Sequence, residues 1–178
     1  MEATTKWVLD PIHSEVQFKV KHLVISTVSG FFRKIKGTIM VENDDFNGGL
    51  IDFSLDADSI DTNHADRDQH LRGPEFFDAA NYPQITFKST SFKRKTGEEY
   101  ELTGDLTLKG TTKQVSLDVI HGGTTIDFYG ETRAGFEISG KINRTAYGLN
   151  WAAKTEAGTF VIGEDIKLAI FAEFTKQK

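Results

Sequence analysis

The strongest constraint in this sequence is an alternation of apolar and polar residues with a period of two. In residues 15–21 the apolar side chains Val16, Phe18 and Val20 occupy the even positions, and polar side chains occupy the odd ones. Successive side chains of a β-strand point to opposite faces, so these three residues would share one face of a strand. A helix would distribute them around its circumference, and the segment is therefore predicted to be a strand.

The same pattern recurs along nearly the whole chain. Its apolar positions are Ile35, Ile39, Val41, Ile51, Phe53, Leu55, Ala57, Ile85, Phe87, Leu102, Leu106, Leu108, Val115, Leu117, Val119, Ile126, Phe128, Phe136, Ile138, Ile166, Leu168, Ile170 and Phe174. Many short strands at regular spacing are typical of antiparallel sandwiches and barrels. We expect an all-β chain of about eight or nine strands.

Turn signals separate these runs of alternation. They fall at residues 43–45, 47–49, 95–98, 109–113 and 122–123, where Gly and Asn accept the positive φ of tight hairpins. Short connections make consecutive strands antiparallel neighbours. Closing the sheet removes the exposed edges that a flat sheet would leave, so an antiparallel barrel is favoured over a sandwich.

One segment, residues 61–80, lacks the alternation. Thr62 or Asn63 would cap the start of a short helix, and Gly73 and Pro74 would end it. Pro74 can begin a second turn over residues 75–80, with the side chains at 76 and 77 facing the barrel. We therefore expect a helical insertion near residues 62–80 that caps or lines one mouth of the barrel.

Composition narrows the partners and the location. The 178 residues suit a single domain over residues 1–178, and the net charge of -5 comes without a basic stripe that would bind nucleic acid. No apolar run is long enough for a transmembrane segment, and the first residues lack the pattern of a signal peptide, so we expect a cytoplasmic protein. Cysteine is absent, which excludes thiolate ligands and nucleophiles.

The residues that could carry chemistry show no catalytic or metal-binding spacing. The histidines are His13, His22, His64, His70 and His121. His64 and His70 are six positions apart, whereas a helical ligand pair needs a separation of three or four. No G-x-S-x-G motif occurs, and the adjacent side chains of His13 and Ser14 would point to opposite faces of a strand. We predict no metal site, no cofactor and no catalytic residue.

The chain is rich in phenylalanine, with 14 Phe against 2 Trp. An eight-stranded barrel has an interior just wide enough to be filled by side chains or to hold one small ligand. The phenylalanines could therefore either fill the interior as a solid core or form the wall of a tunnel. The residue pattern by itself leaves both alternatives open.

Several long blocks resemble one known family. They are residues 7–14 (WVLDPIHS), 18–23, 28–32, 59–62, 67–78, 82–90, 102–113 and 142–149, and they run through nearly the whole chain. In this order they are similar to the YceI-like family, also called the polyisoprenoid-binding or lipid-binding YceI domain. The resemblance implies a lipocalin-like eight-stranded antiparallel barrel that takes a polyprenyl chain, or a related amphiphile such as a quinone, into its interior.

The resemblance also suggests which residues would contact the ligand. An anionic head group near the mouth would meet Arg67, His70 and Arg72, because guanidinium groups bind phosphate in a bidentate manner. The other candidate contact residues are Phe18, Val20, His22, Phe53, Phe76, Phe77, Phe87, Phe136 and Ile170. For the polar residues a structural role is an equal alternative, since Arg67 and Asp68 could fix the insertion and His22 could bond within the wall.

The expected function is non-catalytic binding, transport or storage of an isoprenoid or other long-chain lipid. One alternative is an enzyme that acts on such a lipid, with His22, Asp68 and His70 as acid–base candidates. Another is a protein-interaction barrel with a solid core. A homodimer is a further possibility, because lipid carriers often cover an apolar rim by self-association.

Overall fold

The computed structural model describes residues 3–42, 44–159 and 161–178. Its strands are β1 (Thr4–Leu9), β2 (Glu15–His22), β3 (Ser26–Phe32), β4 (Ile35–Glu42), β5 (Asp45–Asp56), β6 (Ile60–Asp61), β7 (Gln84–Thr96), β8 (Glu99–Leu108), β9 (Thr111–Ile126), β10 (Thr132–Asn143) and β11 (Ile162–Lys176). The helical elements are α1 (Ala65–Arg72) and two 3-10 turns, η1 (Ala57–Ser59) and η2 (Arg144–Tyr147).

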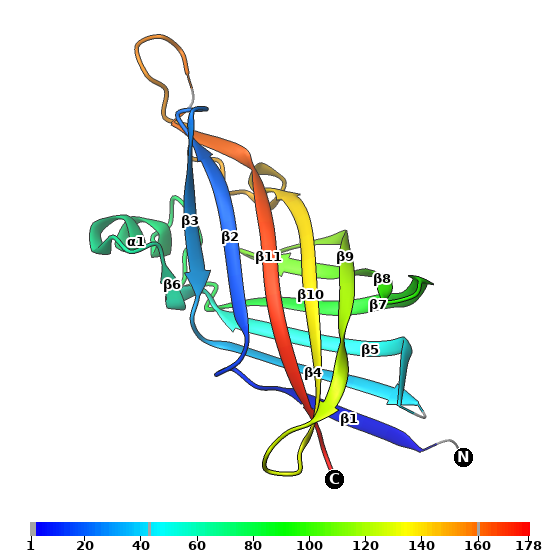
Figure 1. Ribbon diagram of the computed structural model, residues 1–178. Helices are drawn as coiled ribbons and strands as arrows, with labels where there is room; N and C mark the ends of the chain where they lie inside the picture. The colour runs from blue at the N-terminus through cyan, green and yellow to red at the C-terminus, as the bar shows by residue number, and fades with distance from the viewer. Residues whose placement is uncertain (1–2, 43, 160) are drawn as a thin grey trace.

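The strands form one closed antiparallel barrel (Figure 1). β1 and β2 act as a single bent strand, because β1 pairs with β4 while β2 pairs with β3. In the same way β3 pairs with β6 while β4 pairs with β5. β3 and β4 therefore form one bent strand, and so do β5 and β6. The 11 strands thus amount to eight in chain order, which confirms the predicted eight-stranded antiparallel barrel.

The last strand, β11, closes the ring. Its C-terminal end pairs with β1, where Trp7 lies opposite Lys176. Its earlier part pairs with β2, where Val20 lies opposite Ile166. In Figure 1 the wall made by β2, β11, β10 and β9 crosses in front of β4, β5, β7 and β8. Buried apolar side chains from both walls form the interior.

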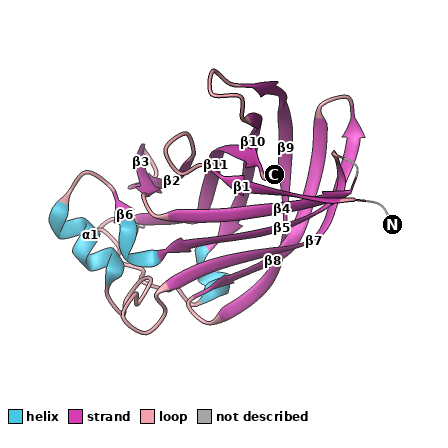
Figure 2. Ribbon diagram, turned by 90° about the horizontal axis from the view of Figure 1, so that it is seen from below, coloured by secondary structure: helices cyan, strands magenta, loops and turns pink. Residues whose placement is uncertain are grey.

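The helix α1 lies beside one end of the barrel, next to β6 and the ends of β4, β5 and β7 (Figure 2). Gly73 follows its last residue as expected, but the predicted cap is wrong. His64 is the N-cap, and its Nδ1 accepts the N–H of Arg67 at 3.1 Å. Thr62 lies before the helix, and its hydroxyl donates to the Asp68 carboxylate at 2.5 Å.

Of the five predicted turns, two are right, two are wrong and one falls partly outside the described residues. Residues 97–98 join β7 to β8, and residues 109–110 join β8 to β9, whereas Asn43 of the turn predicted at 43–45 lies outside the described residues. Gly48 and Gly123 lie within β5 and β9 with φ values of +85° and +122°. At Gly123 the pairing with β10 shifts register, so this glycine forms a β-bulge that bends β9 instead of ending it.

Candidate ligand-binding cavity

The interior of the barrel holds a cavity of about 550 Å³. Its wall is mostly apolar and includes inward side chains from β2, β5, β7, β8, β10 and β11. Ligand-binding pockets for small molecules commonly have volumes of roughly 300–1,000 Å³. The phenylalanines therefore line a space, and the alternative of a solid core is contradicted.

Glycines on neighbouring strands keep two of the lining phenylalanines against the wall. Phe18 on β2 lies opposite Gly30 on β3, and Phe53 on β5 lies opposite Gly37 on β4. A Cβ at Gly30 would lie 2.3 Å from Cζ of Phe18, and a Cβ at Gly37 would lie 3.1 Å from Cδ2 of Phe53. Each ring thus uses the space of an absent side chain, which leaves the centre of the barrel open.

Aromatic side chains seal one end of the cavity. Phe46 packs against Trp7 and Phe136 with ring centroids 5.1 and 5.0 Å apart, and His121 stacks on Phe136 at 4.9 Å. Trp7 and Phe46 are both buried. Because this cluster spans β1, β5, β9 and β10, it fills the barrel at the end away from α1.

The polar lining residues gather at the other end. Apart from Thr86 on β7, they come from the end of β2, from the segment around α1 and from η2: Lys21, His22, Thr62, His64, Asp66, Arg67, His70 and Arg144. The cavity is therefore apolar inside and polar at the end beside α1, which we call the mouth.

Two charged residues of α1 hold the insertion in place. Arg67 donates from Nε to the Thr62 hydroxyl at 2.7 Å and from Nη2 to the Thr62 carbonyl at 2.6 Å. The buried Asp68 carboxylate accepts from the backbone N–H of Thr62 at 2.9 Å as well as from its hydroxyl. Asp68 does not line the cavity, whereas Arg67 does.

His70 belongs to an aromatic cluster at the mouth. Its Nε2 hydrogen-bonds the Glu75 carboxylate, and its ring meets Phe76 and Trp151 edge to face at 5.0 and 5.5 Å. Trp151 also lines the cavity. The sequence analysis missed this residue because the stretch before β11 shows no periodic pattern that would predict which way a side chain points.

Arg144 is a buried cation beside the cavity. It is 4% exposed, and its guanidinium donates to the carbonyls of Leu149, Gly163 and Ile162 at 2.6, 2.8 and 3.4 Å. Burial lowers the pKa of Arg144, and the charge of Glu164 opposes that shift. Arg144 thereby fixes the stretch between η2 and β11 and places a positive charge in the wall near the mouth.

The structure places most of the predicted contact residues around the cavity. Those that line it are Phe18, Val20, His22, Phe53, Arg67, His70, Phe76, Phe77, Phe87, Phe136 and Ile170. Arg72 does not line it, and its Nε donates to the carbonyl of Asp58 at 3.0 Å, which ties α1 to η1.

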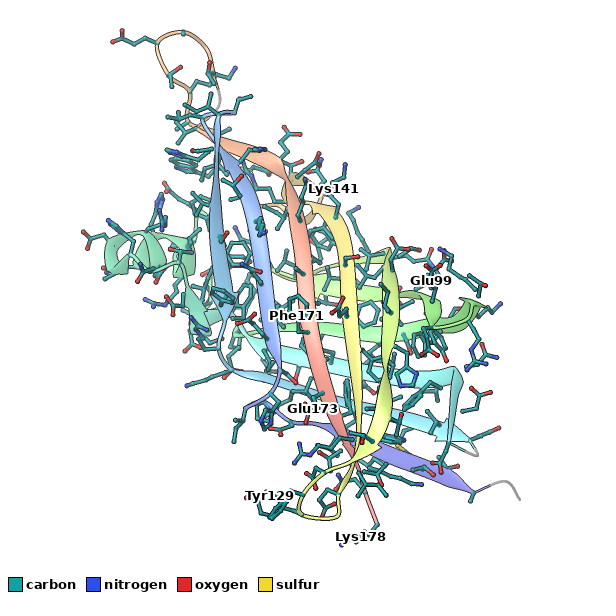
Figure 3. All side chains as sticks on the ribbon, viewed as in Figure 1. Glu99, Tyr129, Lys141, Phe171, Glu173 and Lys178 are labelled. Atoms are coloured by element: carbon teal, nitrogen blue, oxygen red, sulfur yellow. The ribbon has the colours of Figure 1, made fainter. Side chains whose placement is uncertain are left out.

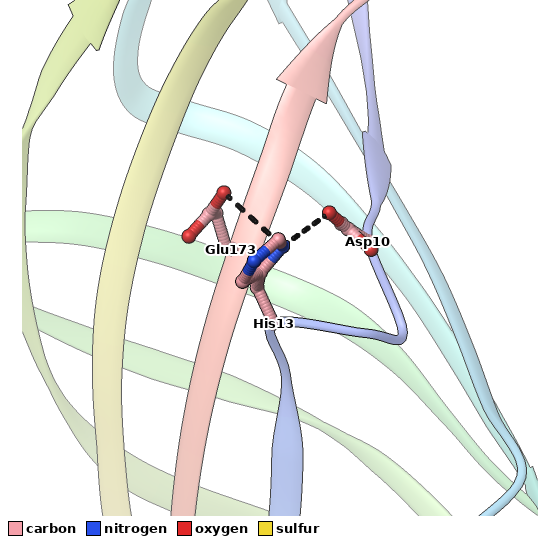
Figure 4. Close-up of side chains that lie close together, drawn as sticks. All are labelled: Asp10, His13 and Glu173. Carbon is pink, nitrogen blue, oxygen red and sulfur yellow. Dashed lines mark hydrogen bonds and ion pairs between the residues drawn. The ribbon is translucent and has the colours of Figure 1, made fainter. Parts of the chain in front are cut away.

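A second polar cluster lies on the outside of the barrel, where His13 stands between Asp10 and Glu173 (Figure 4). His13 Nδ1 is 2.8 Å from Asp10 Oδ2 and 3.9 Å from Glu173 Oε1. Arg133 Nη1 donates to the same two oxygens at 2.7 and 2.9 Å. Because the Arg133 guanidinium already bonds both carboxylates, this cluster is an ion-pair network that joins β1, β10 and β11.

The network shifts the pKa values of its members. Burial raises the pKa of Asp10, but hydrogen bonds from His13, Arg133 and the N–H of Ile12 outweigh it and lower that pKa from 3.8 to about 2. The hydrogen bond to Asp10 and the charge of Glu173 raise the pKa of His13.

Among the residues that the structure describes, no helix has the length and the apolar character needed to cross a membrane. An eight-stranded antiparallel barrel with an enclosed apolar cavity and one polar mouth defines a lipocalin-like β-barrel. Residues 7–174 match the family of YceI-like domains. The chain belongs to the YceI-like domain family, as its sequence blocks indicated.

Individual relatives support the same assignment. The chain is 39% identical to protein YceI of Escherichia coli O157:H7 over 166 residues, which cover 93% of this chain and 83% of that protein. The crystal structure of the Campylobacter jejuni YceI protein matches it with a TM-score of 0.74 at 29% identity, over 89% of this chain and 90% of that one.

A structure from Saccharophagus degradans is similar in fold. It is described as a polyisoprenoid binding domain implicated in plant cell wall breakdown, and it matches with a TM-score of 0.68 at 17% identity, over 99% of this chain and 100% of that one. At this identity the likeness concerns the fold.

Proposed function

We propose that the protein binds a long apolar amphiphile, such as a polyisoprenoid, a polyprenyl phosphate or an isoprenoid quinone, in the barrel interior and catalyses no reaction on it. The observation that carries this proposal is the cavity of about 550 Å³, which is apolar inside, sealed by aromatic side chains at one end and polar at the other. The S. degradans domain of the same fold, described as polyisoprenoid binding, supports the ligand class.

The hydrophobic effect supplies the affinity in this proposal. Each CH₂-sized group that leaves water for the apolar wall contributes roughly 0.8 kcal/mol. The isoprenoid tail lies along the phenylalanines, and the head group stays at the mouth. An anionic head group would find the guanidinium groups of Arg67 and Arg144 there, together with the imidazole of His70.

The arrangement of the acid–base candidates favours a carrier over an enzyme. His22 and His70 line the cavity, but Asp68 does not, and its carboxylate is occupied by two hydrogen bonds from Thr62. A general acid or base must lie within hydrogen-bond reach of the substrate proton that it transfers. Asp68 instead has a structural role. The homodimer and the cytoplasmic location stay predictions.

The decisive experiment measures occupancy of the cavity. The purified protein is analysed by native mass spectrometry and by mass spectrometry of its organic extract, and is then titrated with geranylgeraniol. Ile138→Trp fills the cavity from β10, whereas Ser139→Trp on the same strand points outward and serves as the matched control. We expect bound lipid and geranylgeraniol binding in the wild type and in Ser139→Trp, and loss of both in Ile138→Trp.

Two results would contradict the proposal. A wild-type protein that neither carries an extractable lipid nor binds geranylgeraniol is not a carrier of this kind. A chemically altered lipid that forms with the wild type, and no longer forms with His22→Ala or His70→Ala, would favour the enzyme.

A further inference from the structure

The turn between β2 and β3 exposes apolar side chains beside the mouth of the cavity. Val24 and Ile25 are 67% and 85% exposed. The N–H of Leu23 donates to the carbonyl of Val161 at 2.9 Å, and Val161 lines the cavity, as does His22 at the end of β2. In Figure 1 this turn stands at the same end of the barrel as the loop that precedes β11.

The backbone of this turn is unfavourable for the residues that form it. Leu23 and Val24 have φ values of 53° and 67°, and the N–H of Ile25 donates to the carbonyl of His22 at 3.2 Å. Two consecutive positive φ values define a type I′ turn, for which Asn-Gly is preferred and a β-branched residue such as Val is strained. The tip therefore combines backbone strain with exposed apolar surface, a combination that indicates a role outside the folded chain.

Two basic side chains lie on the strand that leads to the turn. Lys19 and Lys21 lie on β2 close to the turn, whereas Arg33 follows the far end of β3 and pairs with Asp61 at 3.1 Å. Lys19 and Lys21 are exposed on the strand that leads to the tip.

Glu164 and Asp165, at the near end of β11, line a surface pocket together with Lys21 and Val24. Asp165 pairs with Lys141 at 3.6 Å. The hairpin thus presents apolar side chains next to basic ones, which complements an anionic lipid surface.

We propose that the β2–β3 turn inserts Leu23, Val24 and Ile25 into the surface of a phospholipid bilayer that contains anionic head groups, with Lys19 and Lys21 against those head groups. This inference rests on the proposed function, because docking at this turn sets the mouth against the membrane from which a lipid enters. The strain in the turn is then offset by burial of the tip in the bilayer.

A second apolar tip provides a contrast within the same molecule. Phe128 and Tyr129 are 97% and 85% exposed in the loop between β9 and β10, where Figure 3 shows Tyr129 at the end of the barrel away from the β2–β3 turn. This tip lies beside the sealed end, and Asp127 and Glu131 flank it in sequence. Asp127 pairs with Arg133 at 2.6 Å and Glu131 with Lys178 at 3.7 Å. This loop is therefore a control of greater exposed aromatic area at the other end of the barrel.

The test is flotation with vesicles of phosphatidylcholine alone and with phosphatidylglycerol added. The double substitution Leu23→Asn with Val24→Gly installs the residues that a type I′ turn prefers, so we expect the urea midpoint to stay equal or rise. Binding to the anionic vesicles should fall by at least about tenfold, because two of the three inserted apolar side chains are lost. The double variant Phe128→Ser with Tyr129→Ser should bind the anionic vesicles as the wild type does. Added NaCl should weaken vesicle binding of this variant and of the wild type.

Several outcomes would overturn the docking proposal. These are unchanged vesicle binding in the turn variant, an equal loss in the Phe128 and Tyr129 variant, no binding by the wild type, or a dimer in sedimentation equilibrium that the turn variant abolishes. Geranylgeraniol binding without vesicles is measured in parallel. A turn variant that keeps it and loses the vesicles supports docking, whereas failure of geranylgeraniol binding alone counts against the cavity proposal and leaves the docking result standing.

Discussion

The ring of Phe18 on β2 fills the place that a side chain at Gly30 on β3 would need, since a Cβ there would lie 2.3 Å from Cζ of the ring. The two residues are direct partners in the β2–β3 ladder. Thr62 Cγ2 would lie 2.9 Å from the same Cβ, so an added methyl group would meet both side chains. The size of residue 30 therefore decides how far Phe18 reaches into the cavity.

Gly30→Ala should lower both stability and ligand binding. The new methyl group pushes the Phe18 ring inward, and overpacking of this kind costs about 1–3 kcal/mol. The checks are urea unfolding and the affinity for geranylgeraniol. Gly135→Ala on β10 is the control, because its Cβ would have no neighbour within 4 Å and should leave both quantities nearly unchanged. Equal effects of the two substitutions would refute the role assigned to the Phe18–Gly30 pair.

Arg144→Met should loosen the stretch between η2 and β11. The substitution keeps the apolar stem but removes the donors for the carbonyls of Leu149, Ile162 and Gly163, at an expected cost of about 2–3 kcal/mol. Urea unfolding measures the loss, and amide hydrogen exchange should quicken at Leu149 and Ile162. Lys141→Met, at an exposed position on β10, should change the free energy of unfolding by less than about 0.5 kcal/mol. Unaltered exchange in Arg144→Met would count against this role.

The Asp10 carboxylate should make stability depend on pH in the acid range. Its folded pKa of about 2 lies below the ordinary 3.8, so its contribution is complete above pH 3.8 and is lost as the pH falls through about 2. Asp10→Asn should lower the free energy of unfolding at neutral pH by about 1 kcal/mol, because the pair is partly solvated, and should flatten the acid limb.

The pKa of His13 is raised, so its own contribution acts in the opposite direction. It is complete below pH 6.5 and is lost as the pH rises through the folded value. Urea unfolding across the pH range checks both limbs. Asp165→Asn, at an exposed ion pair, is the control, and an acid limb that is identical in Asp10→Asn and the wild type would exclude Asp10 as its source.

The two tryptophans should report on the two ends of the cavity. Trp7 is buried in the sealing cluster, whereas Trp151 lies at the mouth against His70 and Phe76. In Trp7→Phe, geranylgeraniol should shift the fluorescence emission of Trp151 to shorter wavelength, because the ligand displaces water from the mouth. In Trp151→Phe the shift should be much smaller. A shift carried mainly by Trp7 would mean that the ligand disturbs the sealed end.

The alternation of residues predicted the barrel wall because the pleat of a strand fixes which face each side chain occupies. Phe18, Phe53 and Phe87 line the cavity for this reason. The same rule failed at Phe128, where the alternation continues past the end of β9. There Asp127 Oδ1 accepts the N–H groups of Tyr129 and Glu131 at 2.9 Å each, and this side-chain-capped turn ends the strand.

The mouth was harder to predict, because tertiary contacts decide its geometry. Arg144 and Trp151 lie in stretches without a period, and their positions depend on carbonyls of β11 and on rings of the insertion. The cap of α1 was misplaced because Thr62 bonds Asp68, a partner six residues away that local capping rules do not consider. The cavity stays open where a glycine lies opposite a phenylalanine on the neighbouring strand, as Gly30 does opposite Phe18. Such pairs depend on strand register, which composition does not reveal.

The aromatic cluster at Trp7 and Phe46 closes the end of the barrel away from α1, so in the part of the chain that the structure describes the cavity opens at the mouth. In the proposed function, an isoprenoid goes in tail first and comes out head first through that same opening. A protein of this kind would therefore contact the donor and the acceptor membrane one after the other. Release at the acceptor would be the reverse of uptake at the donor. Such a protein would carry lipid between two membranes and would not span them at once.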